Sequence, residues 1–142
     1  MLRTLIPLTL ASALVAGCAH APDPNKVSAP EKSAGLSGDS PAGLVDLAPH
    51  KLAGNMDGYD LRARLLTIAP DGGAAAHPHA GRPGVVRVIK GTVVEGRGTA
   101  QRVLTAGDYW FENADTTHWF RNPSQTEAAE IWAVDIVPKK KP

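Results

Sequence analysis

The sequence predicts an all-β fold, a single jelly-roll β-barrel preceded by a disordered tether. From Leu44 onward, short apolar runs are separated by Gly, Pro, Asn and Asp at intervals of about ten residues, which is typical of strands joined by tight turns. No apolar period of about 3.6 residues is sustained in that region, so helices are not expected. Residues 44–138 are therefore predicted to form the barrel, with a basic tail at residues 139–142.

The first residues are predicted to be an export signal. Arg3 precedes an apolar run at residues 5–15, which suits a signal peptide and is too short to span a bilayer. Residues 14–18 resemble the lipobox of bacterial lipoproteins, in which the cysteine becomes the lipidated first residue of the mature chain. Cys18 is the only cysteine, and an unpaired thiol in an exported protein needs such a reason. Residues 1–17 are thus the expected signal peptide.

Residues 18–43 are expected to be a lipidated cysteine followed by a flexible linker. This stretch holds four prolines among Ser, Gly, Asp and Lys and almost no large apolar side chain. In lipoproteins, an aspartate after the cysteine commonly marks retention at the inner membrane, and Ala19 stands there instead. The resemblance therefore implies the periplasmic side of the outer membrane. A soluble secreted or periplasmic protein is the alternative.

Turn-forming residues divide the barrel region into short strands. They lie at residues 70–73, 96–98, 106–108 and 122–124. The expected strands cover residues 44–47, 59–69, 74–79, 85–90, 92–95, 100–104, 109–111, 118–120 and 128–137. In the last strand, Ile131, Ala133 and Asp135 share one face, and one face of this strand should pack inside the barrel. The aromatic side chains expected in the core are Trp110, Phe111, Trp119, Phe120 and Trp132.

Three histidines are the candidate metal ligands. His77 and His79 lie two residues apart, and alternate side chains of an extended chain point to the same side, so both imidazoles can face one ion. His118 comes from a later strand and would complete the site if that strand lies beside the first. Neutral imidazole suits Zn, Cu, Fe and Ni. Taken singly, each histidine is also explained as an ordinary strand or core residue.

The histidine pair stands in a pattern that resembles the first motif of the cupin family. That motif reads G, five residues, HxH, three or four residues, E, six residues, G. His77, His79 and Gly91 match it in register, and Asp71 holds the position of the opening glycine. Gly84 holds the position of the glutamate that binds metal in the family.

The later histidine stands in a pattern similar to the family's second motif. That motif reads G, five residues, PxG, two residues, H, three residues, N. Gly107, His118 and Asn122 match at this spacing, whereas Asn113 and Asp115 replace the usual proline and glycine. The resemblance implies a small single-domain cupin that holds one divalent transition metal, with Zn, Cu, Fe, Ni and Mn as candidates. Uptake outside the cytoplasm would favour Cu or Zn.

Gly84 makes the expected site unusual, because glycine cannot coordinate a metal. Three histidines without a carboxylate also serve some cupin dioxygenases, and they favour an anionic molecule in the open position. Arg62 and Arg64 share a strand face and could meet such an anion at the barrel mouth, although exposed arginines are commoner. Glu95 and Glu112 are the nearest carboxylates, and neither has the family's ligand spacing.

The function is left open between an enzyme and a binding module. A metal-dependent dioxygenase, isomerase or lyase acting on a small molecule is one interpretation. A non-catalytic ligand-binding or sensing protein, or a degenerate cupin barrel without metal, is the alternative. Fifteen basic and 14 acidic residues give a net charge of +1, so no nucleic-acid partner is expected. A homodimer remains open, since cupins often pair through their sheets.

Overall fold

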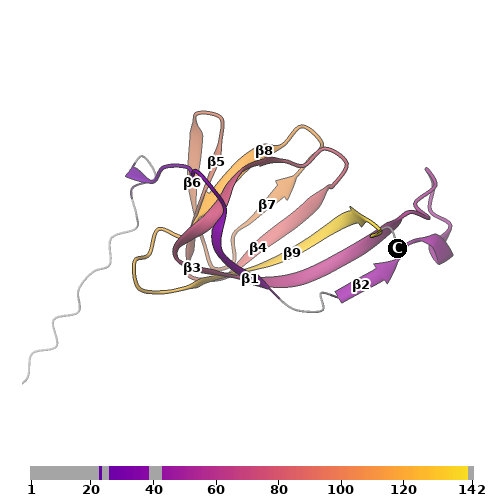
Figure 1. Cartoon of the computed structure of the whole chain (residues 1–142), viewed down its shortest axis with the longest axis horizontal. Coiled ribbons are helices and arrows are strands. Elements are labelled where there is room, and N and C mark those ends of the chain that lie inside the picture. Colours follow the sequence, from indigo (N-terminus) through magenta and orange to yellow (C-terminus); the bar gives the residue numbers. More distant parts are fainter. Residues whose placement is uncertain (1–22, 24–25, 39–42, 141–142) are drawn as a thin grey trace, which may run out of the picture.

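The chain folds into one curled antiparallel sheet, described here from a computed structural model that covers residues 23, 26–38 and 43–140 (Figure 1). The all-β barrel predicted from the sequence is confirmed. The strands are β1 (Ala34–Gly38), β2 (Gly43–Asp46), β3 (Tyr59–Pro78), β4 (Gly84–Lys90), β5 (Thr92–Arg97), β6 (Ala100–Thr105), β7 (Tyr109–Glu112), β8 (Thr117–Arg121) and β9 (Ala129–Pro138). A short 3-10 helix, η2 (Ala48–His50), follows β2. Among the described residues, no helix has the length and apolar character needed to cross a bilayer.

Strand β3 is the centre of the barrel, because it pairs with four other strands along its length. The main order of the sheet is β6-β5-β8-β3-β9-β4-β7, and β1 and β2 also pair with β3. The first half of β3 lies along β9, from Tyr59 opposite Pro138 to Ile68 opposite Ala129. The second half lies along β8, on the other side. This change of partner lets one strand carry the sheet around the barrel.

The sequence predicted two strands here, separated by a turn at residues 70–73, and that prediction is wrong. The chain bends without reversing: Asp71 has a φ of 58°, and Gly73 has no Cβ that would collide with the carbonyl oxygen of Phe120 on β8. The buried side chain of Asn122 holds the bend, since its amide donates to the carbonyl oxygens of Ile68, at 3.1 Å, and Glu127, at 2.8 Å. The motif asparagine is therefore a structural residue.

The sheet begins earlier in the chain than the composition suggested. Ala34–Gly38, expected as part of the linker, forms β1 and pairs with β3, with Leu36 opposite Ile68. All five residues of β1 are exposed, so backbone hydrogen bonds hold this strand and hydrophobic burial contributes little. Composition indicates a strand through its large apolar residues, so it does not indicate a strand whose residues are all exposed. The expected signal peptide and Cys18 lie outside the described residues.

The core lies between the two sides of the barrel and follows the alternation expected of strands. In β9, one face is buried, as predicted, and it is the face of Ile131, Ala133 and Asp135. Two aromatic predictions are wrong: Phe111 is 53% exposed and Trp132 is 42% exposed, because the period of two turns both side chains outward. The main apolar core comprises Ile68, Ala74, Val86, Val88, Val93, Leu104, Trp110, Phe120, Ala129, Ile131 and Ala133.

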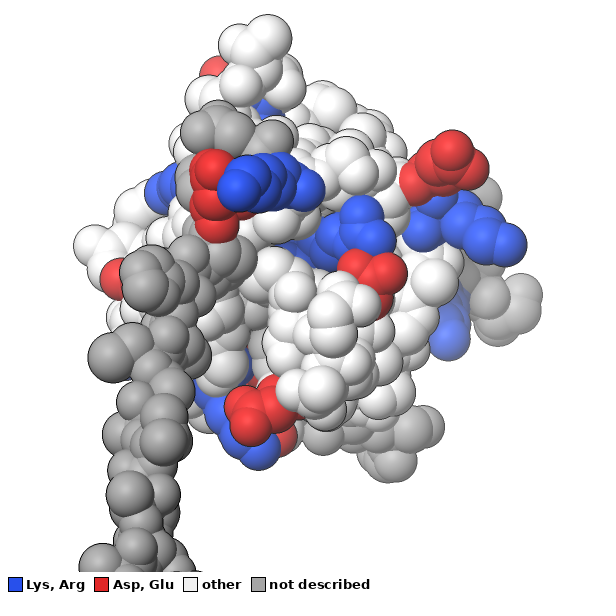
Figure 2. Space-filling view, turned by 90° about the vertical axis from the view of Figure 1, so that its left-hand side faces the viewer, with Lys and Arg blue, Asp and Glu red and all other residues white. Residues whose placement is uncertain are grey.

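On the face drawn in Figure 2, basic and acidic side chains lie next to one another, so neither sign of charge forms a separate patch there.

Candidate metal centre

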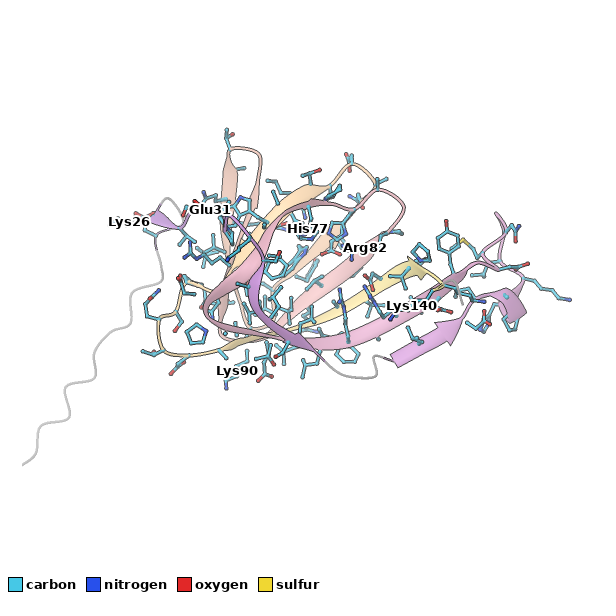
Figure 3. All side chains as sticks on the ribbon, in the orientation of Figure 1. Lys26, Glu31, His77, Arg82, Lys90 and Lys140 are labelled. Atoms are coloured by element: carbon cyan, nitrogen blue, oxygen red, sulfur yellow. The ribbon has the colours of Figure 1, made fainter. Side chains whose placement is uncertain are left out.

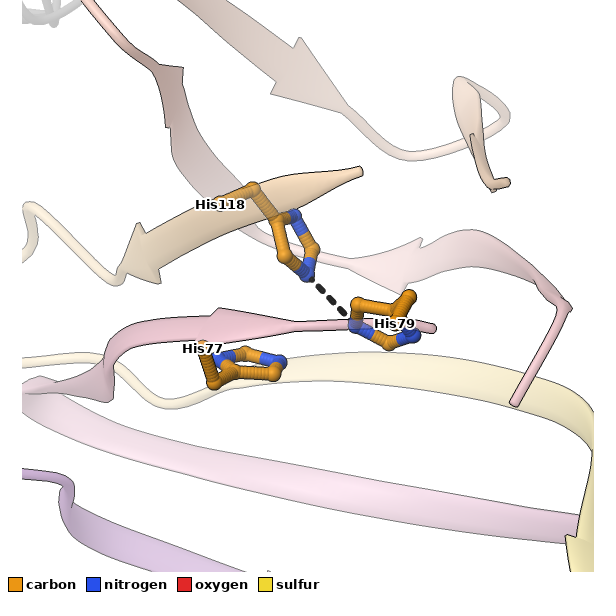
Figure 4. Close-up of side chains that lie close together, drawn as sticks. All are labelled: His77, His79 and His118. Atoms are coloured by element: carbon orange, nitrogen blue, oxygen red, sulfur yellow. Dashed lines mark hydrogen bonds between the residues drawn. The ribbon is translucent and has the colours of Figure 1, made fainter. Parts of the chain in front are cut away.

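The three histidines converge inside the barrel. His77 lies near the end of β3, directly opposite His118 on β8, and His79 follows β3. Figure 3 shows where His77 lies in the barrel, and Figure 4 shows the three rings facing a common point. One ligand atom from each residue lies within 4.8 Å of the others. His79 and His118 are buried, and His77 is partly exposed. The partial exposure of His77 gives a ligand access from one side.

Each histidine has a hydrogen-bond acceptor at Nδ1, which orients its Nε2 toward the common point. The Nδ1 atoms lie 2.8 Å from the Ala75 carbonyl for His77, 3.2 Å from the Arg82 carbonyl for His79, and 3.0 Å from a Glu95 carboxylate oxygen for His118. An Nδ1–H that donates to such an acceptor leaves the Nε2 lone pair free for a metal. The arrangement therefore fits a metal centre better than three unrelated core histidines.

The spacing of the imidazoles also suits one ion. The Nε2 atoms of His79 and His118 are 3.1 Å apart. Two imidazoles bound to one ion at about 2.0–2.1 Å would hold their nitrogens about 3 Å apart. Burial lowers the pKa of His77 and of His79 below the ordinary value of 6.5. A lowered pKa favours the neutral imidazole, which is the form that binds metal.

Glu95 supports the centre from behind His118, a role that the sequence did not reveal. Its side chain is 1% exposed. It accepts hydrogen bonds from Arg97 Nε at 2.7 Å and Arg102 Nε at 2.6 Å, as well as from His118. Burial raises the pKa of Glu95, but the hydrogen bonds from His118, Arg102 and Arg97 outweigh it and bring the pKa to about 2. Glu95 is thus an ionised carboxylate that fixes the orientation of His118.

Glu112 is a second carboxylate that the sequence spacing did not assign to the site. It ends β7 and stands opposite Gly84 on β4. Its Oε2 lies 3.2 Å from His79 Nδ1, and its Oε1 lies 3.6 Å from His118 Nε2. Trp110 Nε1 donates to Oε1 at 3.0 Å. The carboxylate that is missing at Gly84 therefore has a counterpart on the neighbouring strand.

A cavity of about 400 Å³ opens beside the histidines. Its polar lining includes His77, His79, Arg64, Arg82 and Glu112. Its apolar lining comes from the core side of the sheet, and the chain around β1 closes one side of it. These further lining residues are Ser33, Leu36, Ser37, Gly38, Leu66, Ala74, Val86, Trp110, Phe120, Ile131 and Ala133. The volume suits a small molecule held next to the metal centre.

The structure separates the two arginines that the sequence grouped. Arg62 binds Asp135 through two hydrogen bonds of 2.9 and 2.6 Å and does not line the cavity. Arg64 does line it, and its buried Nε has no hydrogen-bond partner. Burial lowers the pKa of Arg64, and the charge of Arg62 lowers it further. Arg82, which sequence reasoning missed, also lines the cavity and is labelled near His77 in Figure 3.

The chain resembles known proteins in sequence and in fold. A family model described as "Cupin domain" matches residues 64–135. The cupin domain of an XRE family transcriptional regulator from Enterobacter cloacae is 19% identical, with a TM-score of 0.52, over 75% of this chain and all of that one. A recombinant oxalate oxidase in complex with glycolate is 20% identical, with a TM-score of 0.51, over 82% of this chain and 64% of that one. No curated protein matches the chain. At these identities, the structural likeness shows the fold alone.

Proposed function

Since this chain belongs to the cupin family, we propose that it is an exported, lipid-anchored metalloprotein that binds a small anionic molecule or acts on one. His77, His79 and His118 hold a single divalent transition metal. The observation that supports this most strongly is the convergence of three imidazoles whose Nδ1 atoms all have acceptors. Uptake of the metal outside the cytoplasm would favour Cu or Zn over Fe or Mn.

The residues around the cavity have different roles in binding. The three imidazoles hold the ion, and Glu95 keeps His118 in the required tautomer. A bound divalent ion would act as a Lewis acid on a carbonyl or carboxyl oxygen. Arg64 and Arg82 lie on the cavity wall and supply positive charge and N–H donors to the rest of the molecule. The apolar wall excludes water from the far side.

The cavity lining contains two arginines, Arg64 and Arg82, and one carboxylate, Glu112, and this excess of positive charge supports an anionic ligand. Asp135 is the carboxylate nearest the arginines, and Arg62 already binds it. The closest approaches of Arg64 and Arg82 to Asp135 are 3.9 Å, too long for a hydrogen bond. The buried Nε of Arg64 needs an acceptor. A carboxylate or similar oxyanion in the cavity would supply it.

Two classes of function fit this site. A metal-dependent enzyme of the dioxygenase, isomerase or lyase class needs the open face of the metal for its substrate. A ligand-binding or sensing module needs the same face and no turnover. A metal-free barrel is the third interpretation, and the arrangement of the Nδ1 acceptors favours the first two. Turnover assays with a panel of small acids, sugars and thiols distinguish the enzyme from the binder.

The location and assembly belong to the same proposal. Lipidation at Cys18 would tether the protein to the periplasmic side of the outer membrane, with soluble secretion as the alternative. A homodimer is supported by apolar side chains on the outer face of β4, β7 and β9, where Val85, Phe111 and Trp132 are exposed. The net charge of +1 supports the absence of a nucleic-acid partner. Lipidation is tested by growth with a radioactive fatty acid, which should label the wild type and not Cys18→Ala. The homodimer is tested by light scattering of the purified protein.

Metal content is the decisive experiment. The purified mature protein should contain about one equivalent of a transition metal by elemental analysis, and His118→Ala should contain almost none. His50→Ala is the matched control, because His50 is exposed and lies outside the site. A wild-type protein without stoichiometric metal, and without affinity for added Zn²⁺ or Cu²⁺, would refute the metal function.

A further inference from the structure

We propose that Glu112 is the carboxylate ligand of this metal centre and takes the place of the glutamate that the family carries at the position of Gly84. The inference rests on the proposed function, since it requires a metal at the three histidines. It replaces the expectation of a carboxylate-free site with a site of three histidines and one glutamate, in which the glutamate comes from β7.

The register of the sheet places Glu112 where a side chain at position 84 would reach. Gly84 on β4 and Glu112 on β7 are direct cross-strand partners, and directly opposed residues point to the same face of a sheet. A Cβ built on Gly84 would lie 2.6 Å from Glu112 Oε2. A glutamate at position 84 and the present position of Glu112 therefore exclude each other. Glycine at 84 makes room for the carboxylate from β7.

Among the described residues, no lysine or arginine forms an ion pair with Glu112. Glu95, Glu112 and Asp135 are the buried carboxylates among the described residues. Glu95 is paired with two arginines, and Asp135 is bound by Arg62. The ion pairs of Glu112 within the described chain involve only histidines.

Those histidines cannot serve as cations while they bind metal, because coordination requires neutral imidazole. A buried carboxylate without a positive partner is costly. A divalent ion at the histidines supplies the missing charge, and it does so next to Glu112. The same ion gains an anionic ligand, which leaves the centre with a smaller net charge to be neutralised by the substrate.

Glu112 lies next to the group of three histidine ligand atoms, which are within 4.8 Å of one another. Oε1 lies 3.6 Å from His118 Nε2, and neighbouring ligand atoms on an ion with bonds of about 2.0–2.1 Å are about 3 Å apart. Oε1 therefore lies slightly farther from His118 Nε2 than a neighbouring ligand atom would, and a small rotation of the Glu112 side chain would close that difference. The N–H of Trp110 donates to the same oxygen and orients the carboxylate toward the histidines.

The first test measures Zn²⁺ affinity of the metal-free protein by competition with a chromophoric chelator. Glu112→Gln keeps the size of the side chain and the acceptor for Trp110 but removes the charge. Its affinity should fall by more than about 100-fold, beyond the range of about 10–100-fold for an outer-shell partner. Glu95→Gln is the matched control: Glu95 is also buried, but it contacts His118 only at Nδ1, and the loss of affinity should stay within that range.

The visible absorption spectrum of bound Co²⁺ reports the ligand set independently of affinity. Glu112→Gln should move the d–d bands, because a coordinating atom changes, whereas Glu95→Gln should leave their positions unchanged. A swap variant, Gly84→Glu combined with Glu112→Gly, returns the carboxylate to the family position. It should bind Zn²⁺ at least tenfold more tightly than Glu112→Gly alone, and it keeps the proposal testable if Glu112→Gln does not fold.

The outcomes separate this inference from the proposed function. Equal affinity losses in Glu112→Gln and Glu95→Gln, with an unchanged Co²⁺ spectrum, would overturn the role of Glu112 and leave the metal site intact. A swap variant no tighter than Glu112→Gly would do the same. A wild-type protein that binds neither Zn²⁺ nor Co²⁺ would refute the metal function itself, and this inference with it.

Discussion

Replacement of Glu95 by glutamine removes the carboxylate that joins His118 to two arginines. Burial raises the pKa of Glu95, and the hydrogen bonds from His118, Arg102 and Arg97 lower it from the ordinary value of 4.5 to about 2. At about 1.36 kcal/mol for each pKa unit, this difference corresponds to about 3 kcal/mol of folding stability at neutral pH. Glu95→Gln should therefore lower the free energy of unfolding by about 3 kcal/mol at pH 7.

The sign of the pH dependence follows from the lowered pKa. A carboxylate with a folded pKa below its unfolded pKa stabilises the protein above pH 4.5, and the contribution disappears as the pH falls toward 2. The difference between the wild type and Glu95→Gln should shrink to about 1 kcal/mol at pH 3. At that pH the unfolded carboxyl is protonated, whereas most of the folded population is not.

Urea unfolding of the metal-free protein, followed by tryptophan fluorescence, measures both quantities. Chelator is present throughout, so that metal binding does not contribute to the free energy of unfolding. Glu127→Gln is the control, since Glu127 is exposed and its replacement should change the stability by less than about 0.5 kcal/mol. A loss below 1 kcal/mol for Glu95→Gln at pH 7, or the same loss at pH 7 and pH 3, would show that the ionised carboxylate does not stabilise the fold.

Three further predictions concern the cavity, the histidines and the bend in β3. Arg64→Met should weaken the binding of a small carboxylate about tenfold or more by calorimetry, and exposed Arg87→Met should not. Burial holds the pKa of His77 below 6.5, so the wild type should lose stability as the pH falls below 6.5, and His77→Gln should lose less. Equal losses of stability in urea unfolding would contradict this prediction. Gly73→Ala should cost about 1–3 kcal/mol, because the new Cβ meets the backbone of β8, whereas Gly58→Ala, with open space around it, should match the wild type in the same assay.

The local parts of the fold were predictable because they depend on neighbours in the chain. Alternation in β9 placed Ile131, Ala133 and Asp135 on one face, and the structure shows that this face is the buried one. Turn residues marked most strand ends to within a few positions. The incorrect predictions have a common cause, because each of these features depends on which strands pair. Asp71 and Gly73 are turn residues by type, but pairing with β9 on one side and β8 on the other makes them a bend inside one strand. The exposed strand β1 has no composition that separates it from a linker.

The candidate site divides in the same way. Two-residue spacing in an extended chain put His77 and His79 on one side, and the motif spacing added His118. Arg82 could not be found this way, because nothing in its local sequence shows that it faces the cavity. Arg62 and Arg64 have the same spacing and different partners: Arg62 binds Asp135, while Arg64 faces the cavity. The difference depends on side chains brought from β9.

From the sequence alone, the chain was predicted to be an all-β barrel with His77 and His79 on one side of a strand, because strand alternation is a short-range property. The resemblance to the second cupin motif added His118. The tertiary structure decided which carboxylates serve those histidines. Glu95 reaches His118 and Glu112 stands opposite Gly84 only because β5 pairs with β8 and β7 pairs with β4. Such pairings join residues far apart in the chain, and their register depends on the packing of the whole barrel. Gly84 marked an absent ligand in the sequence, and the sheet shows the carboxylate that occupies its space.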